Sequence, residues 1–142
     1  MNTRVSVDDI RAIVNQFVYF IETNPERANE LRPYNIAYHP REKKAFWIAR
    51  AQNVDPQLEL AYKSPEERLG LPFTTRGASQ WALGALVYHL ITGRPPVIKI
   101  EDGKVKEWVT YEHIGWIHSD LLVFVGQYLC MSESCRGGTL WS

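Results

Sequence analysis

The sequence predicts one mainly helical domain, spanning residues 1–142, with small β-hairpins. Apolar residues recur at helical spacing within residues 10–21 and again within residues 81–91. Short apolar runs flank turn residues in two further places, which is the usual pattern of a hairpin. No internal repeat, low-complexity tract or domain boundary divides the chain, and its 142 residues suit a single domain.

The first helix begins at a capping motif. Ser6 is the expected N-cap, and Asp9 is placed to reach back to it as in a capping box. One face of the helix is apolar and predicts burial: Ile10, Ile13, Val14, Phe17, Val18 and Ile21. Asn24 and Pro25 end the helix.

A hairpin is predicted next, with strands at residues 35–38 and 45–48 around a polar turn at residues 39–43. Residues 49–80 show little periodicity and contain scattered proline and glycine. We therefore expect a long irregular segment there. Such segments are uncommon in compact domains and are usually functional or inherited from a larger architecture.

The strongest helix covers residues 81–91, where nearly every side chain is apolar or small, so burial all round is expected. Gly93 and the prolines after it end this helix. A second hairpin turns at Asp102 and Gly103. Ser119 caps a final helix that runs to Leu129.

Composition excludes several classes of function. The 16 basic and 16 acidic residues balance, so we expect no general attraction to nucleic acid or to a membrane surface. No stretch has the roughly 18 apolar residues of a membrane span, and no signal peptide is visible. The two cysteines, Cys130 and Cys135, make no disulfide framework. A cytoplasmic protein is expected.

Four segments resemble the C-terminal lobe (C-lobe) of protein kinases, in the order in which that lobe has them. Residues 81–96 (W-A-L-G-A-L-V-Y-H-L-I-T-G-R-P-P) resemble its buried central helix, and residues 62–66 (Y-K-S-P-E) the A-P-E end of the activation segment. Residues 31–36 (L-R-P-Y-N-I) resemble the catalytic loop, and residues 120–136 the late helix with its D-P-x-x-R ending. The resemblance covers residues 7–142 and implies a kinase C-lobe standing alone.

The resemblance also implies that the catalytic acids are replaced. Ala28, Asn29 and Glu30 occupy the place of H-R-D, and the place of D-F-G reads A-R-A from Ala49. Kinases need those aspartates to orient the substrate hydroxyl and to bind Mg²⁺. Asn35 matches the second metal ligand, but one neutral amide does not hold Mg²⁺. We therefore expect no cofactor, no metal and no ATP binding.

Three further features follow from the same resemblance. Only the residues before Val7 precede the first helix, so no Gly-rich loop or strand lysine of an N-terminal lobe (N-lobe) is expected. Ser79 stands where kinases have an aspartate that braces the catalytic loop. Glu66 and Arg136 match the family's buried ion pair, a contact whose loss costs about 3–5 kcal/mol.

Neither the histidines nor Glu30 makes a persuasive catalytic or metal site. His113 and His118 are five residues apart, one too many for a helical ligand pair. His89 lies within the central helix, where a hydrogen-bonded core role is expected. Glu30 has no metal ligand or nucleotide clamp to work with.

Aromatic residues mark the candidate partner surfaces. One group follows the cleft edge that an N-lobe covers in a kinase, and a second occupies the region where kinases dock proteins. The candidates are Tyr34, Tyr38, Phe46 and Trp47 in the first group, and Trp108, Tyr111 and Trp116 in the second. Burial of alternate side chains in the core is the competing interpretation.

The expected function is a non-catalytic protein-interaction or scaffold module, not an enzyme, that binds a protein partner or a second copy of itself. Two alternatives remain open. One is an enzyme of another class that uses the relict cleft, and the other is a half-kinase completed by a separate N-lobe-like partner.

Overall fold

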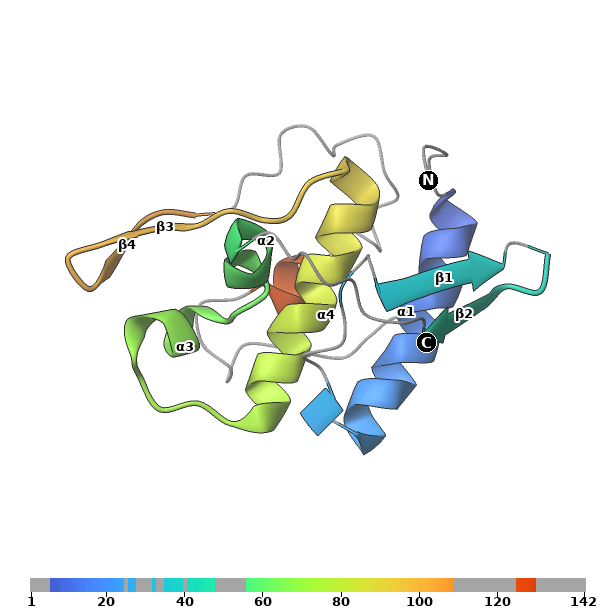
Figure 1. Ribbon diagram of the computed structural model, residues 1–142, viewed down its shortest axis with the longest axis horizontal. Coiled ribbons are helices and arrows are strands. Elements are labelled where there is room, and N and C mark those ends of the chain that lie inside the picture. Colours follow the sequence, from blue (N-terminus) through green and yellow to red (C-terminus); the bar gives the residue numbers. More distant parts are fainter. Residues whose placement is uncertain are drawn as a thin grey trace.

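The computed structural model describes residues 6–24, 26–27, 32, 35–39, 41–47, 56–108 and 125–129. Its elements, in chain order, are α1 (Val7–Thr23), β1 (Ile36–His39), β2 (Lys44–Trp47), α2 (Pro56–Ala61), α3 (Pro65–Leu69), α4 (Thr75–Thr92), β3 (Lys99–Glu101) and β4 (Lys104–Glu107) (Figure 1). Within these residues the fold is helical with two separate antiparallel hairpins. The predicted fold class is confirmed.

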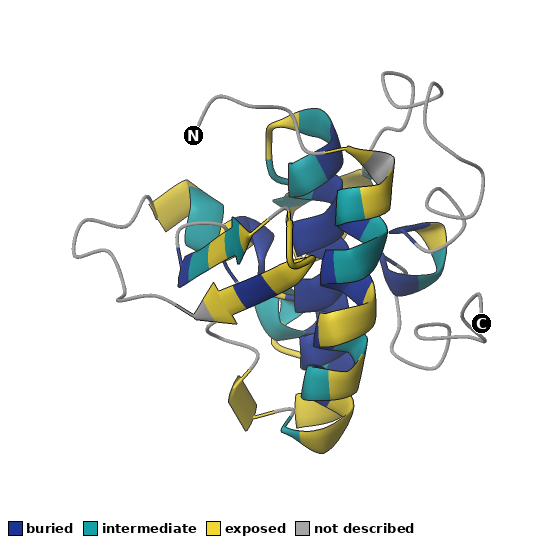
Figure 2. Cartoon of the chain, turned by 90° about the vertical axis from the view of Figure 1, so that its right-hand side faces the viewer, coloured by how far each residue is buried: buried dark blue, intermediate teal, exposed yellow. Residues whose placement is uncertain are grey.

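Helix α4 is the centre of the molecule. Its residues are buried in an almost unbroken run from Ser79 to Tyr88, as the all-round apolar pattern predicts. Helix α1 packs along it in the opposite direction, and buried residues gather where the two helices lie (Figures 1 and 2). Gly93 caps the end of α4 in a left-handed conformation, with φ 83°, and donates its N–H to the carbonyl of His89.

The start of α4 corrects the sequence prediction. The helix begins at Thr75, because the side chain of Thr74 caps it by accepting the N–H of Gly77 at 3.0 Å. The irregular segment predicted for residues 49–80 also contains the short helices α2 and α3. That prediction was wrong for these stretches, because helices of six and five residues are too short to show apolar periodicity, and α3 begins instead at the cap of Ser64.

A short helical turn at residues 125–128 packs against α4 at Gly84. A Cβ on Gly84 would lie 2.8 Å from the Cβ of Tyr128 and 3.0 Å from a methyl carbon of Leu129. Glycine is therefore needed here for close approach of two elements. The rest of the predicted final helix, residues 119–124, lies outside the described residues.

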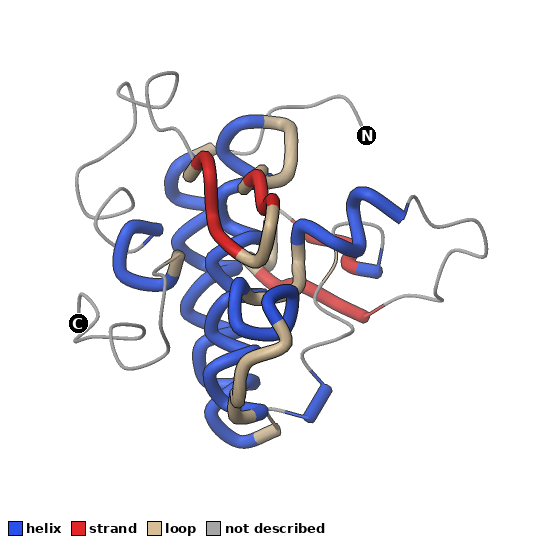
Figure 3. Tube along the Cα trace, turned by 90° about the vertical axis from the view of Figure 1, so that its left-hand side faces the viewer, coloured by secondary structure: helices blue, strands red, loops and turns tan. Residues whose placement is uncertain are grey.

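Both predicted hairpins form. Strands β1 and β2 pair from Ile36 opposite Trp47 to His39 opposite Lys44. Strands β3 and β4 turn at Asp102 and Gly103, whose φ angles of 54° and 72° suit a tight two-residue hairpin turn. This second hairpin extends away from the helices in Figure 1, and in Figure 3, which is viewed from that side, it lies in front of them.

Candidate functional site

The segment that resembles the end of an activation segment forms helix α3. Ser64 begins it with a full capping box: the Ser64 N–H donates to the Glu67 carboxylate at 2.8 Å, and the Glu67 N–H donates to the Ser64 hydroxyl at 3.3 Å. Glu66 follows Pro65 and is buried. Its predicted ion-pair partner, Arg136, lies outside the described residues, so that pair stays a prediction.

Arg32, from the segment that resembles the catalytic loop, is buried and paired. Its Nε lies 3.0 Å from a carboxylate oxygen of Glu59 in α2. Its guanidinium carbon also lies 4.6 Å from the ring centre of Tyr62, which is a cation–π contact. The Arg32 guanidinium thereby joins its own segment to α2, although Arg32 and Glu59 are 27 residues apart. The sequence analysis did not predict the pair of Arg32 and Glu59. The available indication was the basic residue in the motif L-R-P-x-N-I.

Tyr62 and Ala61 connect the same region to α4. The Tyr62 hydroxyl lies 3.3 Å from Nδ1 of His89, and the indole N–H of Trp81 donates to the Ala61 carbonyl at 3.1 Å. Burial lowers the pKa of His89, which favours the neutral ring. His89 is therefore a hydrogen-bonded, half-buried residue of the packed helix, as the sequence predicts.

Ser79 is turned toward its own helix. Its hydroxyl is buried and donates to the carbonyl of Arg76 at 2.7 Å. Asn35, which matches a metal-ligand position, is buried too, and its backbone N–H donates to the carbonyl of Arg32 at 3.0 Å. In the part of the chain that the structure describes, no group of three or more His, Cys, Asp or Glu side chains is placed to hold a metal ion.

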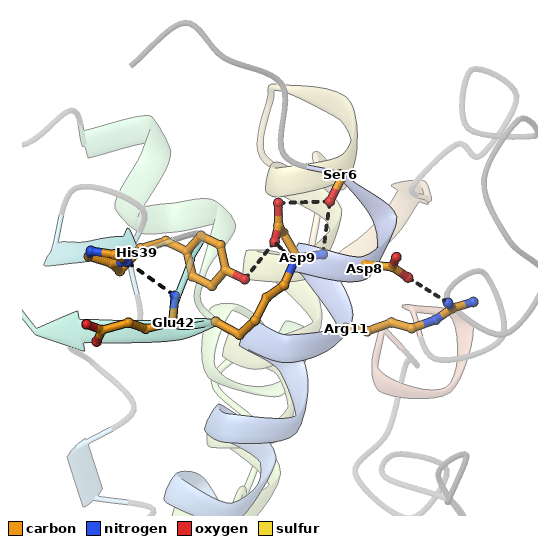
Figure 4. Close-up of polar contacts among 8 residues, drawn as sticks. Ser6, Asp8, Asp9, Arg11, His39 and Glu42 are labelled. Carbon is orange, nitrogen blue, oxygen red and sulfur yellow. Dashed lines mark hydrogen bonds and ion pairs between the residues drawn. The ribbon is translucent and has the colours of Figure 1, made fainter.

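The first hairpin is held against α1 by polar contacts (Figure 4). The Asp9 carboxylate accepts from the hydroxyls of Ser6 and Tyr38 at 2.8 and 2.7 Å and pairs with the ammonium of Lys43 at 2.8 Å. The contact expected between Asp9 and its N-cap residue is therefore present, with the Ser6 hydroxyl as the donor. The amide of Gln16 in α1 also bonds both the carbonyl and the N–H of Ala45, at 2.7 and 3.0 Å.

These contacts explain two perturbed pKa values. The bonds from Lys43 and Tyr38 lower the pKa of Asp9 to about 2. Burial and the Asp9 carboxylate raise the pKa of Tyr38 to about 12. Tyr38 is consequently a half-buried residue engaged in anchoring the hairpin.

The other aromatic candidates differ in their surroundings. Phe46 lies on the outer face of the hairpin, opposite Ala37, and 45% of it is exposed. Trp108 is half-buried and meets Trp81 edge to face, with ring centres 5.8 Å apart. The backbone of Trp47 lies in β2 opposite Ile36. Tyr34, Tyr111 and Trp116 lie outside the described residues.

None of the described helices is long and apolar enough to cross a membrane.

No protein-family profile and no curated protein matches this chain. Among solved structures, the chain is similar to the kinase PK-1 of Cydia pomonella granulovirus, with 16% sequence identity and a TM-score of 0.70. The match covers 97% of this chain and 57% of the viral kinase's chain. At this identity the likeness concerns the fold. The chain has a protein-kinase-like fold, mainly helical and consistent with a C-lobe, and it spans little more than half the length of the viral kinase.

Proposed function

We propose that this chain is a non-catalytic protein-interaction module built on a kinase-like C-lobe. One observation carries the proposal: the sequence has Ala28, Asn29 and Glu30 where the resemblance places H-R-D, and Ala49 where it places the metal-binding aspartate. Phosphoryl transfer depends on positioning the nucleophile and on metal ions that neutralise charge. Without those aspartates neither requirement is met.

The polar contacts of the same region support this proposal. The cation of Arg32 is engaged by Glu59 and by the ring of Tyr62, and the hydroxyl of Ser79 is engaged by its own helix. Arg32 thus joins two segments of the chain, and Ser79 is bonded within α4. Residues that stabilise the scaffold are retained while residues that perform chemistry are replaced, which is the pattern of a domain kept for its shape.

Phe46 is the described candidate best placed for a partner. It stands on the outer face of a hairpin whose inner face is anchored to α1 through Tyr38 and Ala45. A large aromatic side chain on a rigid element binds with little loss of conformational entropy. Trp108 is half-buried against Trp81, so only part of its ring area remains for a partner.

Nucleotide binding tests the non-catalytic part of the proposal. Melting temperature is measured while ATP and Mg²⁺ are titrated, because a ligand that binds the folded state raises its stability. We expect no shift. A rise in melting temperature with micromolar affinity would overturn the proposal, and loss of that rise in Asn35→Ala would place the nucleotide in the relict cleft.

Partner binding tests the other part. Proteins recovered by affinity purification from native cells are identified and then measured against purified variants, and self-association is followed by analytical ultracentrifugation. Phe46→Ser should weaken the recovered interaction by about thirtyfold, as for a hot-spot aromatic. Tyr19→Ser is the matched control, because Tyr19 is an aromatic residue of α1 that is 73% exposed. Equal effects of the two substitutions would contradict a role for Phe46.

One finding favours a second candidate function, a half-kinase completed by a separate N-lobe-like partner. The chain spans 57% of the length of the viral kinase, which leaves the remainder of a kinase to be supplied by other residues. In that case the complex with the recovered partner should bind ATP·Mg²⁺ while the isolated chain does not.

A further inference from the structure

Arg68 is a partly buried cation on α3. It lies one turn after the buried Pro65, so the two residues share the face of the helix that packs inward. Among the described residues, none places a carboxylate oxygen within ion-pair distance of its guanidinium. The neighbouring Glu67 is used by the capping box of Ser64, and Glu66 is buried.

This arrangement distinguishes Arg68 from the other arginines that the structure describes. Arg11, Arg32 and Arg76 each meet a carboxylate. The remaining described arginines, Arg27, Arg41 and Arg94, are exposed to water. Arg68 has lost part of its hydration, and no described residue supplies it with a counter-charge. Burial accordingly lowers the pKa of Arg68, although a guanidinium stays charged at neutral pH. A partly desolvated guanidinium without a partner attracts an oxyanion, which it can bind through two parallel hydrogen bonds.

An exposed apolar segment begins directly after the same helix. Gly70 turns the chain in a left-handed conformation, and the N–H of Leu71 donates to the carbonyl of Glu66 at 2.9 Å, which ties the start of the segment to α3. Leu71 and Phe73 are 51% and 49% exposed. The cap of α4 at Thr74 holds the other end of the segment. Two large apolar side chains are thus presented on a short connection fixed at both ends.

This segment is separate from the first hairpin. Helix α3 and its connection to α4 lie at the opposite side of the molecule from β1 and β2 (Figure 1). The charge and apolar exposure here therefore belong to a different surface from the one that Phe46 occupies.

We propose that Arg68, Leu71 and Phe73 form a docking site for an acidic segment of a protein partner. A carboxylate of the partner pairs with the Arg68 guanidinium, and an apolar side chain beside that carboxylate packs on Leu71 and Phe73. Charge complementarity selects this occupant, since Arg68 has no ion-pair partner among the described residues and the exposed Leu71 and Phe73 follow it within five positions of the chain. The inference rests on the proposed function, because it specifies the chemistry of the partner of an interaction module.

Selection of peptides from a displayed random library tests the site. Peptides that bind the wild-type chain should be enriched in aspartate or glutamate next to a large apolar residue. For these peptides, measured by fluorescence polarisation, Arg68→Glu should weaken binding by about thirtyfold. Arg94→Glu makes the same charge change at an exposed arginine and should leave affinity unchanged. Replacing the acidic residue of a peptide with lysine should restore binding to Arg68→Glu.

Three outcomes would overturn the site: selected peptides without acidic enrichment, peptides that bind Arg68→Glu as tightly as the wild type, and no selected peptides at all. If binding is instead lost in Phe46→Ser, the docking site is wrong while the interaction module stands. ATP·Mg²⁺ binding, by contrast, would remove the proposed function and leave the peptide result unaffected. Thermal melting of each variant checks that it is folded, and Arg68→Gln replaces Arg68→Glu if charge reversal lowers the melting temperature.

Discussion

Replacing Gly84 with alanine tests the packing at the centre of the fold. The added Cβ would lie 2.8 Å from the Cβ of Tyr128, closer than side-chain carbons normally approach. Because the Tyr128 Cβ is attached to the backbone, no rotamer change of that residue relieves the contact. Either α4 or the helical turn at residues 125–128 must shift.

The magnitude follows from two opposing effects. Overpacking a close-packed core typically costs about 1–3 kcal/mol. Alanine in a helix interior gains about 1 kcal/mol relative to glycine. A contact with backbone-attached carbon lies toward the costly end of the first range, so we expect a net loss of about 1–2 kcal/mol in the free energy of unfolding. For a chain of this size that loss lowers the melting temperature by roughly 3–6 °C.

Calorimetry and urea denaturation of Gly84→Ala provide the measurement. Gly126→Ala is the matched control, because a Cβ on that exposed glycine would meet nothing within 4 Å, and it should be as stable as the wild type or slightly more so. If Gly84→Ala proves as stable as Gly126→Ala, the close approach of α4 and the turn at residues 125–128 is wrong.

Three further predictions concern polar contacts. The pKa of Asp9 is lowered from 3.8 to about 2, so its carboxylate contributes stability that is complete above pH 4 and is lost as pH falls toward 2. The melting temperature of Asp9→Asn should therefore vary less with pH over that range than that of the wild type. The same pH dependence in both proteins would contradict the assignment. Thr74→Ala removes the cap of α4 and should cost about 1 kcal/mol, whereas Thr74→Ser should cost little; equal losses in the two variants would argue against capping. Glu59→Gln leaves the buried Arg32 with a neutral partner and should lower stability by about 1–3 kcal/mol in urea denaturation; a variant as stable as the wild type would show that the pair is not a stabilising contact.

Local chemistry alone determined much of the backbone. The end of α4 at Gly93 and the turn at Asp102 and Gly103 were predictable because left-handed conformations strongly favour glycine, asparagine and aspartate. The first helix was predictable because its apolar residues repeat at helical spacing. The resemblance of residues 81–96 to a kinase helix also depends on local sequence, namely an apolar helix that ends at Gly93 and two prolines. The prediction of the fold class was based on that resemblance.

The extent of α4 required more than periodicity. Ser79 and Gln80 are polar yet buried, so a search for apolar spacing alone placed the start of this helix too late. These two residues are buried because other elements pack against them. The cap at Thr74 depends on a single hydroxyl group. Polar helix starts of this kind are recognised from caps and not from hydrophobicity.

The fold class could thus be predicted from the sequence, while the pairing of side chains required the tertiary structure. Arg32 meets Glu59 across 27 residues, and Tyr38 meets Asp9 across 29. No local pattern predicts such contacts, because they depend on how α1, α2 and the hairpins are placed around α4. The same placement leaves Arg68 partly buried without a counter-charge among the described residues. A side chain's charge is a property of the residue, but its desolvation is a property of the fold.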